Sequence, residues 1–397
     1  MSFPNGKSIV SVKHTYFESA GTPEAEMVRF LKGKAASILS IRHPFHDAVQ
    51  IPLNTKAVEY GPDGNVTRET TAPAVHGNAL LFYLKDLILS VYYVIRSGKK
   101  YDLYVGSDNL NSLAGIVLRM LGRVRRVAFY VIDFTPARFP GRLMNAVYQA
   151  INKICCYHAD VIWNVSPAMT EGRERIGIRA SLSAPQITVP LGCDFRKIQM
   201  AGGGVRDPRV IVYFGALREE HGPGLILEAL PAILEKIPDA RVVLAGGGEL
   251  REKLENRAHE LGLADRVWFT GFISSDEEVY RILLECGLAL ATYPPEDGTY
   301  KRYCDPGKVK IYLACGLPVL ITDVPAVARE IAERGAGAIV EYDPKNLAEA
   351  VTGILLNPAE QEVMRERALA LAAEYDWDAI WERTFGEMEK LFTSPKG

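Results

Sequence analysis

Short apolar segments alternate with helical segments along nearly the whole chain, and this alternation limits the possible folds more than any other feature. Strand-like runs occupy Ser8–Val12, Ala35–Ile41 and Val127–Ile132 in the first half, and Val210–Phe214 and Leu317–Thr322 in the second. Strands that alternate with helices form parallel sheets with helices on both faces. At 397 residues the chain is long enough for two such cores. We therefore predict an α/β protein with two doubly wound, Rossmann-like domains.

The segment Tyr303–Asp323 combines a loop, a short helix and a buried strand. It reads YCDPGKVKIYLACGLPVLITD, in which Asp305 suits the N-cap and Pro306 the first helical position. A helix start presents unpaired N–H groups and the positive end of the helix dipole, which favour phosphate. Lys308 adds a cation in the same turn, whereas the spacing turns Lys310 to the other side. Taken alone, the pattern fits an ordinary capped helix equally well.

The motif Asp305-Pro306-x-Lys308-x-x-x-Tyr312-Leu313-Ala314-Cys315-Gly316-x-Pro318-Val319 resembles the donor-site segment of the family 4 retaining glycosyltransferases. His158-Ala159-Asp160 and Val189-Pro190-x-Gly192-x-Asp194 resemble the same family, and the resemblance is strongest over residues 209–342. It implies the GT-B fold, in which two Rossmann-like domains face a cleft. It also implies sugar transfer, with retention, from a nucleotide diphosphate sugar of the UDP or GDP type to a glycan, lipid-linked or small-molecule acceptor. Neither a metal ion nor another cofactor is expected.

The same comparison divides the chain into domains. We predict that residues 1–197 form the acceptor-side domain and that residues 208–375 form the domain that binds the nucleotide sugar. The linker is expected within residues 195–207, where the run Gly202–Gly204 gives flexibility. A terminal helix in residues 376–397 is expected to cross back toward the N-terminal domain.

The resemblance places the donor-binding residues in three segments of the second domain. In the first loop the family usually carries an arginine and a lysine that reach the diphosphate; this chain has Ala216 and His221 there. Arg218 is the strong cation of this loop and can substitute for them, with an ion pair to a neighbouring glutamate as the alternative. The loop at Gly271 and Phe272 is expected to hold the base. The predicted donor-binding set is Gly215, Arg218, His221, Gly271, Phe272, Asp305, Pro306, Lys308 and Tyr312.

Candidate residues of the first domain lie in loops at the carboxyl ends of predicted strands, where ligands bind in open α/β sheets. We predict His14 and Asp133 as catalytic residues, and Gly21 and His43 as acceptor-side residues. The family commonly carries a His-Asp pair at the strand end that precedes Asp133, and here Ile132 replaces the histidine. A packing role is the alternative for both histidines.

Three positions depart from the family pattern. They are Ala216, Ile132 and Ile311, the last of which replaces a glutamate that the family associates with the ribose. Such losses are also typical of a decaying active site. A non-catalytic GT-B subunit or scaffold of a glycosylation complex is therefore an alternative, and a GT-B sugar-nucleotide epimerase is another.

Charge is unevenly distributed along the chain. Residues 1–197 contain 24 basic and 15 acidic residues, a net charge of +9, whereas residues 198–397 contain 22 and 33, a net charge of −11. The basic half predicts an anionic partner. A cluster of arginines in this half is interpreted as a solvated basic surface, and the alternative is contact with anionic lipid or with a lipid-phosphate acceptor. The cluster comprises Arg119, Arg123, Arg125, Arg126, Arg138 and Arg142. Nucleic acid is excluded because the acidic half would repel it and no binding motif is present.

The most apolar segment, Ala79–Ile95, contains Lys85 and Asp86 and predicts a buried core helix rather than a membrane span. The chain starts without the pattern of a signal peptide, and its six cysteines lack metal-binding spacing. We therefore expect a cytoplasmic protein in a reducing compartment, peripheral on the inner face of the membrane.

Overall fold

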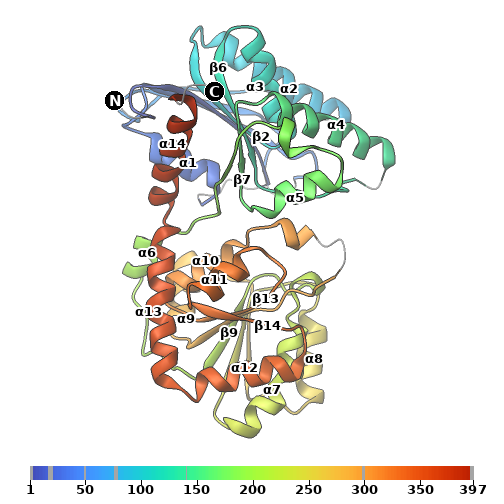
Figure 1. Cartoon of the computed structure of the whole chain (residues 1–397), viewed down its shortest axis with the longest axis vertical. Helices are drawn as coiled ribbons and strands as arrows, with labels where there is room; N and C mark the ends of the chain where they lie inside the picture. Colours follow the sequence, from blue (N-terminus) through green and yellow to red (C-terminus); the bar gives the residue numbers. More distant parts are fainter. Residues whose placement is uncertain are drawn as a thin grey trace. The chain divides into compact units, whose positions relative to one another are not determined.

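The computed structural model describes residues 3–16, 21–48, 51–75, 79–139, 141–296 and 300–393. Contacts divide the chain into two compact units (Figure 1). The N-terminal unit comprises Met1–Pro190 and Ile380–Gly397, and the C-terminal unit comprises Leu191–Ala379. Each unit is built on its own sheet with parallel central strands, which confirms the predicted α/β class with two doubly wound sheets.

The N-terminal unit contains an eight-stranded sheet in the order β4-β3-β2-β1-β5-β6-β7-β8. The strands are β1 (Ser8–Thr15), β2 (Ser37–Pro44), β3 (Lys56–Tyr60), β4 (Val66–Thr71), β5 (Tyr101–Ser107), β6 (Val124–Val131), β7 (Val161–Asn164) and β8 (Gln186–Thr188). All neighbours pair in parallel except β3, which pairs antiparallel with both β2 and β4. The hairpin at the edge of the sheet thus follows the turn-rich sequence between its two strands.

Helices cover this sheet. They are α1 (Pro23–Leu31), α2 (Ala79–Arg96), α3 (Asn109–Met120), α4 (Arg142–His158), α5 (Ala168–Arg175) and most of α14 (Trp377–Thr393). Helix α3 lies very close to β5, because a Cβ on Gly115 would come within 2.4 Å of the Tyr104 ring. This approach fixes the start of α3 at the carboxyl edge of the sheet. From Ile380 onward, α14 belongs to the N-terminal unit, where Trp381 packs against Trp163 with ring centroids 6.0 Å apart.

The C-terminal unit contains a six-stranded, all-parallel sheet in the order β11-β10-β9-β12-β13-β14. The strands are β9 (Val210–Phe214), β10 (Arg241–Ala245), β11 (Val267–Gly271), β12 (Leu288–Ala291), β13 (Val319–Thr322) and β14 (Gly337–Val340). The helices are α6 (Phe195–Met200), α7 (Gly224–Lys236), α8 (Arg251–Glu260), α9 (Asp276–Leu284), α10 (Gly307–Ala314), α11 (Val327–Glu333), α12 (Pro344–Leu355) and α13 (Pro358–Glu374). Figure 1 shows α7, α8 and α12 on one face of this sheet and α9, α10 and α11 on the other.

Strand order reverses once in each sheet, and these points locate candidate sites. In the C-terminal unit the chain adds β10 and β11 on one side of β9 and then β12 on the other. In the N-terminal unit β2 lies on one side of β1 and β5 on the other. The loops that follow two such strands diverge and leave a crevice at their carboxyl ends. Ligand sites are therefore expected beyond β9 and β12, and beyond β1 and β5.

Helix α2 is not the buried core helix that its sequence predicts. Its apolar side chains occupy more than one face, and the sheet covers only part of them. The exposed ones are Leu80, Leu81, Leu84, Ile88, Tyr92 and Ile95. Within the described ranges, no helix is both long and apolar enough to cross a membrane.

The expected linker is partly helical. Helix α6 occupies Phe195–Met200 because Asp194 caps it, accepting a hydrogen bond of 3.2 Å from the N–H of Lys197. Only the glycine-rich remainder, after Met200, is free of regular structure. The linker predicted within residues 195–207 therefore stays a prediction for the part after Met200, which contains Gly202–Gly204.

Candidate functional site

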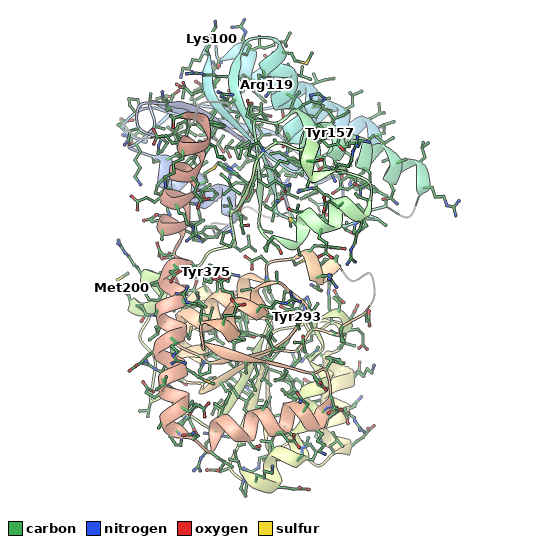
Figure 2. The ribbon with its side chains drawn as sticks, viewed as in Figure 1. Lys100, Arg119, Tyr157, Met200, Tyr293 and Tyr375 are labelled. Atoms are coloured by element: carbon green, nitrogen blue, oxygen red, sulfur yellow. The ribbon has the colours of Figure 1, made fainter. Side chains whose placement is uncertain are left out.

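Lys308 lies at the switch point of the C-terminal sheet, in the first turn of α10. Its ammonium nitrogen is buried, lies 4.2 Å from the ring centre of Tyr213 and 4.9 Å from that of Tyr293, and has no hydrogen-bond partner among the described residues. Tyr293 follows β12 and is labelled in Figure 2. Burial and the neighbouring ammonium of Lys301 lower the pKa of Lys308 to about 7. The faces of two tyrosine rings stabilise a buried cation only weakly, so the Lys308 ammonium favours binding of an anion.

The loop after β9 borders this ammonium. A Cβ on Gly215 would lie 3.7 Å from the Lys308 nitrogen, so the backbone of the loop approaches the lysine without a side chain between them. Gly246, after β10, permits this arrangement: its φ is +148°, and a Cβ there would come within 2.1 Å of the Gly215 carbonyl oxygen. The two loops together form a glycine-walled recess beside Lys308.

His221 orients a second lysine toward the same recess. Its Nδ1–H donates to the carbonyl of Ala216 at 2.9 Å, and its Nε2 lies 2.6 Å from Nζ of Lys301. Burial, together with Lys308 and Lys301, lowers the pKa of His221 to about 4, so the ring is neutral and Nε2 accepts from the ammonium. Two cations thus flank the recess. The sequence analysis predicted His221 as a donor-site residue but did not predict Lys301. The sequence marks Lys301 only as one of several charged residues in the loop before Asp305.

Two predicted donor residues, Asp305 and Tyr312, fix the position of α10. Pro306 is the N-cap, and Asp305 is buried, pairs with the buried ammonium of Lys310 and accepts from the N–H of Leu191 at 2.7 Å. The prediction of Asp305 as N-cap is wrong, because this ion pair turns its carboxylate away from the helix start. Tyr312 is fully buried, and its hydroxyl accepts from the N–H of Phe214 at 2.6 Å. It fixes α10 against β9 and does not line the recess.

Of the remaining predicted donor residues, Arg218 and Phe272 lie at the surface, whereas Gly271 is buried. Arg218 is exposed, and its guanidinium lies 3.8 Å from the carboxylate of Glu220, so the structure favours the ion-pair alternative. Gly271 ends β11 with a φ of +75°, and Phe272 follows with 83% of its side chain exposed. A Cβ on Gly247, in the adjacent loop, would lie 3.4 Å from the Cβ of Phe272, and a flat ring of a ligand could stack on the exposed Phe272 ring.

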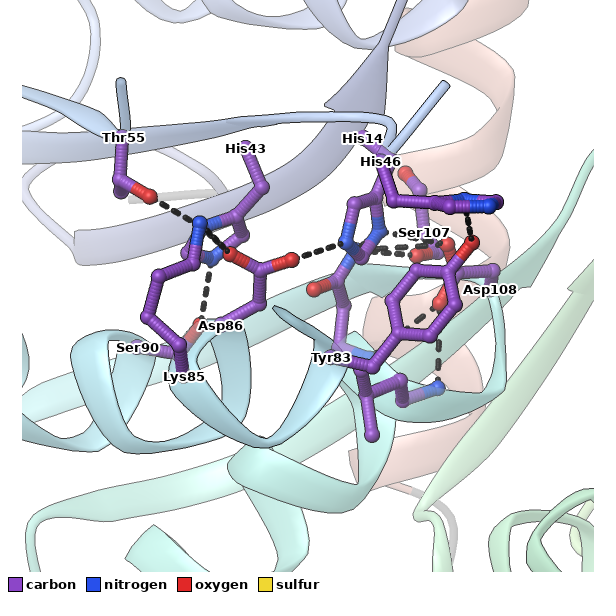
Figure 3. A network of polar contacts seen from close by, with 12 residues as sticks. His14, His43, His46, Thr55, Tyr83, Lys85, Asp86, Ser90, Ser107 and Asp108 are labelled. Atoms are coloured by element: carbon purple, nitrogen blue, oxygen red, sulfur yellow. Dashed lines mark hydrogen bonds and ion pairs between the residues drawn. The ribbon is translucent and has the colours of Figure 1, made fainter. Parts of the chain in front are cut away.

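At the switch point of the N-terminal sheet, His14 lies between two carboxylates (Figure 3). Its Nδ1 is 3.0 Å from Oδ2 of Asp108, and its Nε2 is 3.1 Å from Oδ2 of Asp86. Burial alone would lower the pKa of His14, but Asp108 and Asp86 outweigh it and raise the value to about 9. The imidazole is therefore a cation at neutral pH and donates to both carboxylates.

Asp86, on α2, joins His14 to a deeper buried layer. Nδ1 of His43 lies 3.1 Å from Oδ1 of Asp86 and 2.9 Å from the hydroxyl of Thr55, and Nε2 lies 2.8 Å from the hydroxyl of Ser90. Burial lowers the pKa of His43, which stays neutral. His43 is completely buried, so its predicted place on the acceptor side is wrong. His43 instead fixes the position of the Asp86 carboxylate, which pairs with His14.

Asp108 is the carboxylate of this network that reaches a surface. It caps α3 by accepting with Oδ1 from the N–H groups of Leu110 and Asn111, and this leaves Oδ2 for His14. Its φ of +71° is unusual for a residue other than glycine, and such strain is often found at functional sites. Its side chain is 37% exposed. In the sequence, Asp108 directly precedes a helix and has only the pattern of a helix cap.

A cavity of about 230 Å³ opens beside His14 and Asp108. It lies between α2, α3 and α4, and most of its wall is apolar. Its lining residues are His14, Phe45, Leu80, Tyr83, Leu84, Leu87, Asp108, Asn109, Leu110, Leu113, Arg138, Phe139, Met144, Val147, Tyr148 and Ile151.

Two other residues predicted for the first domain do not line this cavity. Asp133 is exposed after β6, and Gly21 is exposed before α1 with a φ of +92°.

The six arginines that were expected to act together lie at two ends of the N-terminal sheet. Arg119 and Arg126 share the carboxylate of Asp160 at the amino end of β6, at 2.5 and 2.9 Å (Figure 2 labels Arg119). Arg138 and Arg142 follow the other end of that strand. β6 has eight residues and is roughly 25 Å long; Arg126 lies near its first end, and the chain reaches Arg138 and Arg142 only after its second end. The two groups therefore do not form a single basic patch, and Asp160 offsets part of the charge.

Comparison with known proteins gives a family match for part of the C-terminal unit. The family model described as Glycosyl transferases group 1 matches residues 208–357, which include the recess around Lys308. A GDP-mannose-dependent alpha-(1-6)-phosphatidylinositol dimannoside mannosyltransferase of Mycobacterium tuberculosis is 31% identical over 210 residues, 51% of this chain and 50% of that protein. The chain thus spans about half the length of the first curated relatives it matches.

Two further proteins resemble the chain over most of its length. A phosphatidyl-myo-inositol mannosyltransferase of Mycobacterium leprae is 26% identical over 389 residues, 93% of this chain and 91% of that protein. The structure of HepE from Anabaena, determined in complex with UDP, superposes with a TM-score of 0.67 at 17% identity, covering 97% of this chain and all of that one. Residues 208–357 therefore match the group 1 glycosyltransferases, and the chain has the GT-B fold that its sequence predicts.

Proposed function

We propose that the protein transfers a hexosyl group from a nucleotide diphosphate sugar to a hydroxyl of an acceptor. The observation that carries this proposal is the buried ammonium of Lys308, without a hydrogen-bond partner among the described residues, at the switch point of the C-terminal sheet. The diphosphate of the donor would lie against Lys308, Lys301 and the N–H groups at the start of α10. We expect a UDP or GDP donor, as the named relatives suggest, and retention of configuration, as the family resemblance implies.

The arrangement suits the charge that develops in such a reaction. As the bond between the sugar and the diphosphate breaks, negative charge accumulates on the departing phosphate. Fixed cations and helix-end N–H groups that already point to this position stabilise the transition state without reorganisation. Phe272, exposed at the end of β11, would stack on the base. On the acceptor side, the free face of Asp108 would accept a hydrogen bond from the acceptor hydroxyl, with His14 holding the carboxylate.

Thermal unfolding in the presence of UDP, GDP, ADP and their sugars tests the donor site. A ligand at 100 times its dissociation constant stabilises the folded state by about 2.7 kcal/mol. We expect one nucleotide family to raise the melting temperature and thereby to fix the base. If every nucleotide leaves it unchanged, a non-catalytic scaffold becomes the better description. Conversion of a bound nucleotide sugar without any acceptor would instead indicate an epimerase.

We infer further that the N-terminal unit contacts an anionic membrane, on its inner face, through α2 and the start of α4. Exposed apolar side chains of α2 and Leu143, which is 78% exposed, would enter the interface, and Arg142 would meet the lipid phosphates. The relatives named after phosphatidylinositol substrates support this inference.

Liposome sedimentation tests this contact. At low salt we expect clearly greater recovery on anionic than on neutral liposomes, and Arg142→Glu should reduce it. Arg125→Glu is the matched control, because Arg125 is equally exposed but lies near the opposite end of β6. Equal recovery on both kinds of liposome would end the idea.

A further inference from the structure

We propose that the cavity between α2, α3 and α4 binds the apolar chain of the acceptor, so that the acceptor is an amphipathic molecule with an alkyl or isoprenoid tail. This inference rests on the proposed function, since it names the class of acceptor for the same transfer. The shape and chemistry of the cavity support it. Two relatives are named after phosphatidylinositol acceptors, but their names assign no place in the fold to the apolar part of the acceptor.

Two helices contribute the same pattern to the cavity wall. Helix α2 supplies Leu80, Tyr83, Leu84 and Leu87, at spacings of three, four and seven residues from the first. Helix α4 supplies Met144, Val147, Tyr148 and Ile151, at the same spacings. Residues at these spacings form one face of a helix, and apolar faces of this kind normally pack against another element.

These two faces leave a gap instead of closing on each other. Both helices pack against α3, whose Leu110 and Leu113 form the floor of the cavity. The side chains at the rim remain open to solvent: Leu80 is 64% exposed, Leu84 49% and Val147 45%. The volume of about 230 Å³ is below that of pockets that enclose a whole drug-sized ligand and suits a single chain.

The polar groups of the cavity lie at one end, which indicates the orientation of the occupant. Asp108 and His14 stand at the carboxyl ends of β5 and β1, where the acceptor hydroxyl is expected. The guanidinium of Arg138 lies above the Tyr148 ring, 5.8 Å from its centre, and offers a site for an anionic group such as a phosphate. The cavity is therefore amphipathic and continuous with the proposed acceptor site. An occupant of the same character places its head group at Asp108 and its tail between α2 and α4.

Binding of n-alkyl phosphates to the whole protein tests the proposal without a donor or turnover. For hexyl, octyl and decyl phosphate, calorimetric titration below their micelle concentrations should give affinities that rise about fourfold per methylene group. Leu84→Gln, on the cavity wall, should weaken decyl phosphate at least tenfold. Ile88→Gln is the matched control, one turn further along α2 and 57% exposed, but outside the cavity lining.

Three outcomes would overturn the proposal. The first is an affinity that does not depend on chain length. The second is an equal loss in Leu84→Gln and Ile88→Gln, which would indicate adsorption to the outer face of α2. The third is a dimer in sedimentation that Leu84→Gln dissociates, which would mean that a second copy covers the cavity. Nucleotide-induced thermal shifts, measured on the same variants, confirm that they fold and test the proposed function separately.

Discussion

Replacing Lys308 with methionine is expected to weaken binding of the donor nucleotide sugar at least tenfold, about 1.4 kcal/mol. The ammonium has no hydrogen-bond partner among the described residues. The donor diphosphate can therefore form a charged hydrogen bond with it without first breaking a hydrogen bond within the protein. Methionine keeps most of the apolar stem between the two tyrosine rings. Titration calorimetry of both proteins with the same nucleotide sugar measures the difference.

The same interaction should make donor affinity depend on pH. Because the pKa of Lys308 in the free protein is about 7, the lysine is increasingly neutral above that pH, and a bound anion raises its pKa again. Binding therefore takes up a proton above pH 7. The affinity should be nearly constant below this value and fall by up to tenfold per pH unit above it. The Lys308→Met variant should lose this dependence.

A lysine in the first turn of another helix provides the control. Lys345 is exposed near the start of α12, and Lys345→Met should change neither the affinity nor its pH profile. If Lys308→Met binds the donor as tightly as the unaltered protein does, Lys308 does not contact the diphosphate and the site lies elsewhere.

Replacing Asp86 with asparagine is expected to destabilise the N-terminal unit by about 3–5 kcal/mol, the usual cost of removing one partner of a buried ion pair. The His14 side chain is 2% exposed and that of Asp86 is fully buried. Without the carboxylate, the imidazolium keeps only Asp108, and Nδ1 of His43 loses its charged neighbour. In a domain of this size the melting temperature should fall by roughly 10 °C, which scanning calorimetry resolves unit by unit.

The pH dependence of this effect follows from the two shifted groups. The pKa of His14 is raised from 6.5 to about 9, so its contribution to stability is fully present below pH 6.5 and is lost as pH rises through about 9. Although burial alone would raise it, the histidines lower the pKa of Asp86, so its contribution is present above about pH 4. The difference in unfolding free energy between Asp86→Asn and the unaltered protein should be largest between about pH 4 and pH 6.5. It should become smaller as the pH rises through about 9.

An exposed carboxylate provides the comparison for Asp86→Asn. Glu171 pairs with Arg175 at 2.6 Å, but both side chains are about half exposed, so Glu171→Gln should cost less than about 1 kcal/mol. A melting temperature of Asp86→Asn that matches that of Glu171→Gln would mean that the buried network contributes little.

Several features of this protein follow from local sequence alone. The runs of β-branched residues and the helical periods between them determine two parallel sheets, because each depends on neighbouring residues only. The turn Gly61–Asn65 determines the edge hairpin. The helix start before Lys308 also follows from local signals, although its cap does not: an ion pair between Asp305 and Lys310 overrides the helix-capping preference of aspartate.

The tertiary structure decides what these local signals leave open. Helix α2 has apolar residues on several faces, so only its position on the sheet determines which face forms a cavity wall and which remains exposed. Asp86 and Asp108 come from a helix and a loop far from His14 in sequence, and they meet it because strand order reverses at β1. A histidine at a strand end is thus predictable. Its charge is not, because that depends on carboxylates which only the packed fold brings to 3.0 and 3.1 Å from its ring nitrogens.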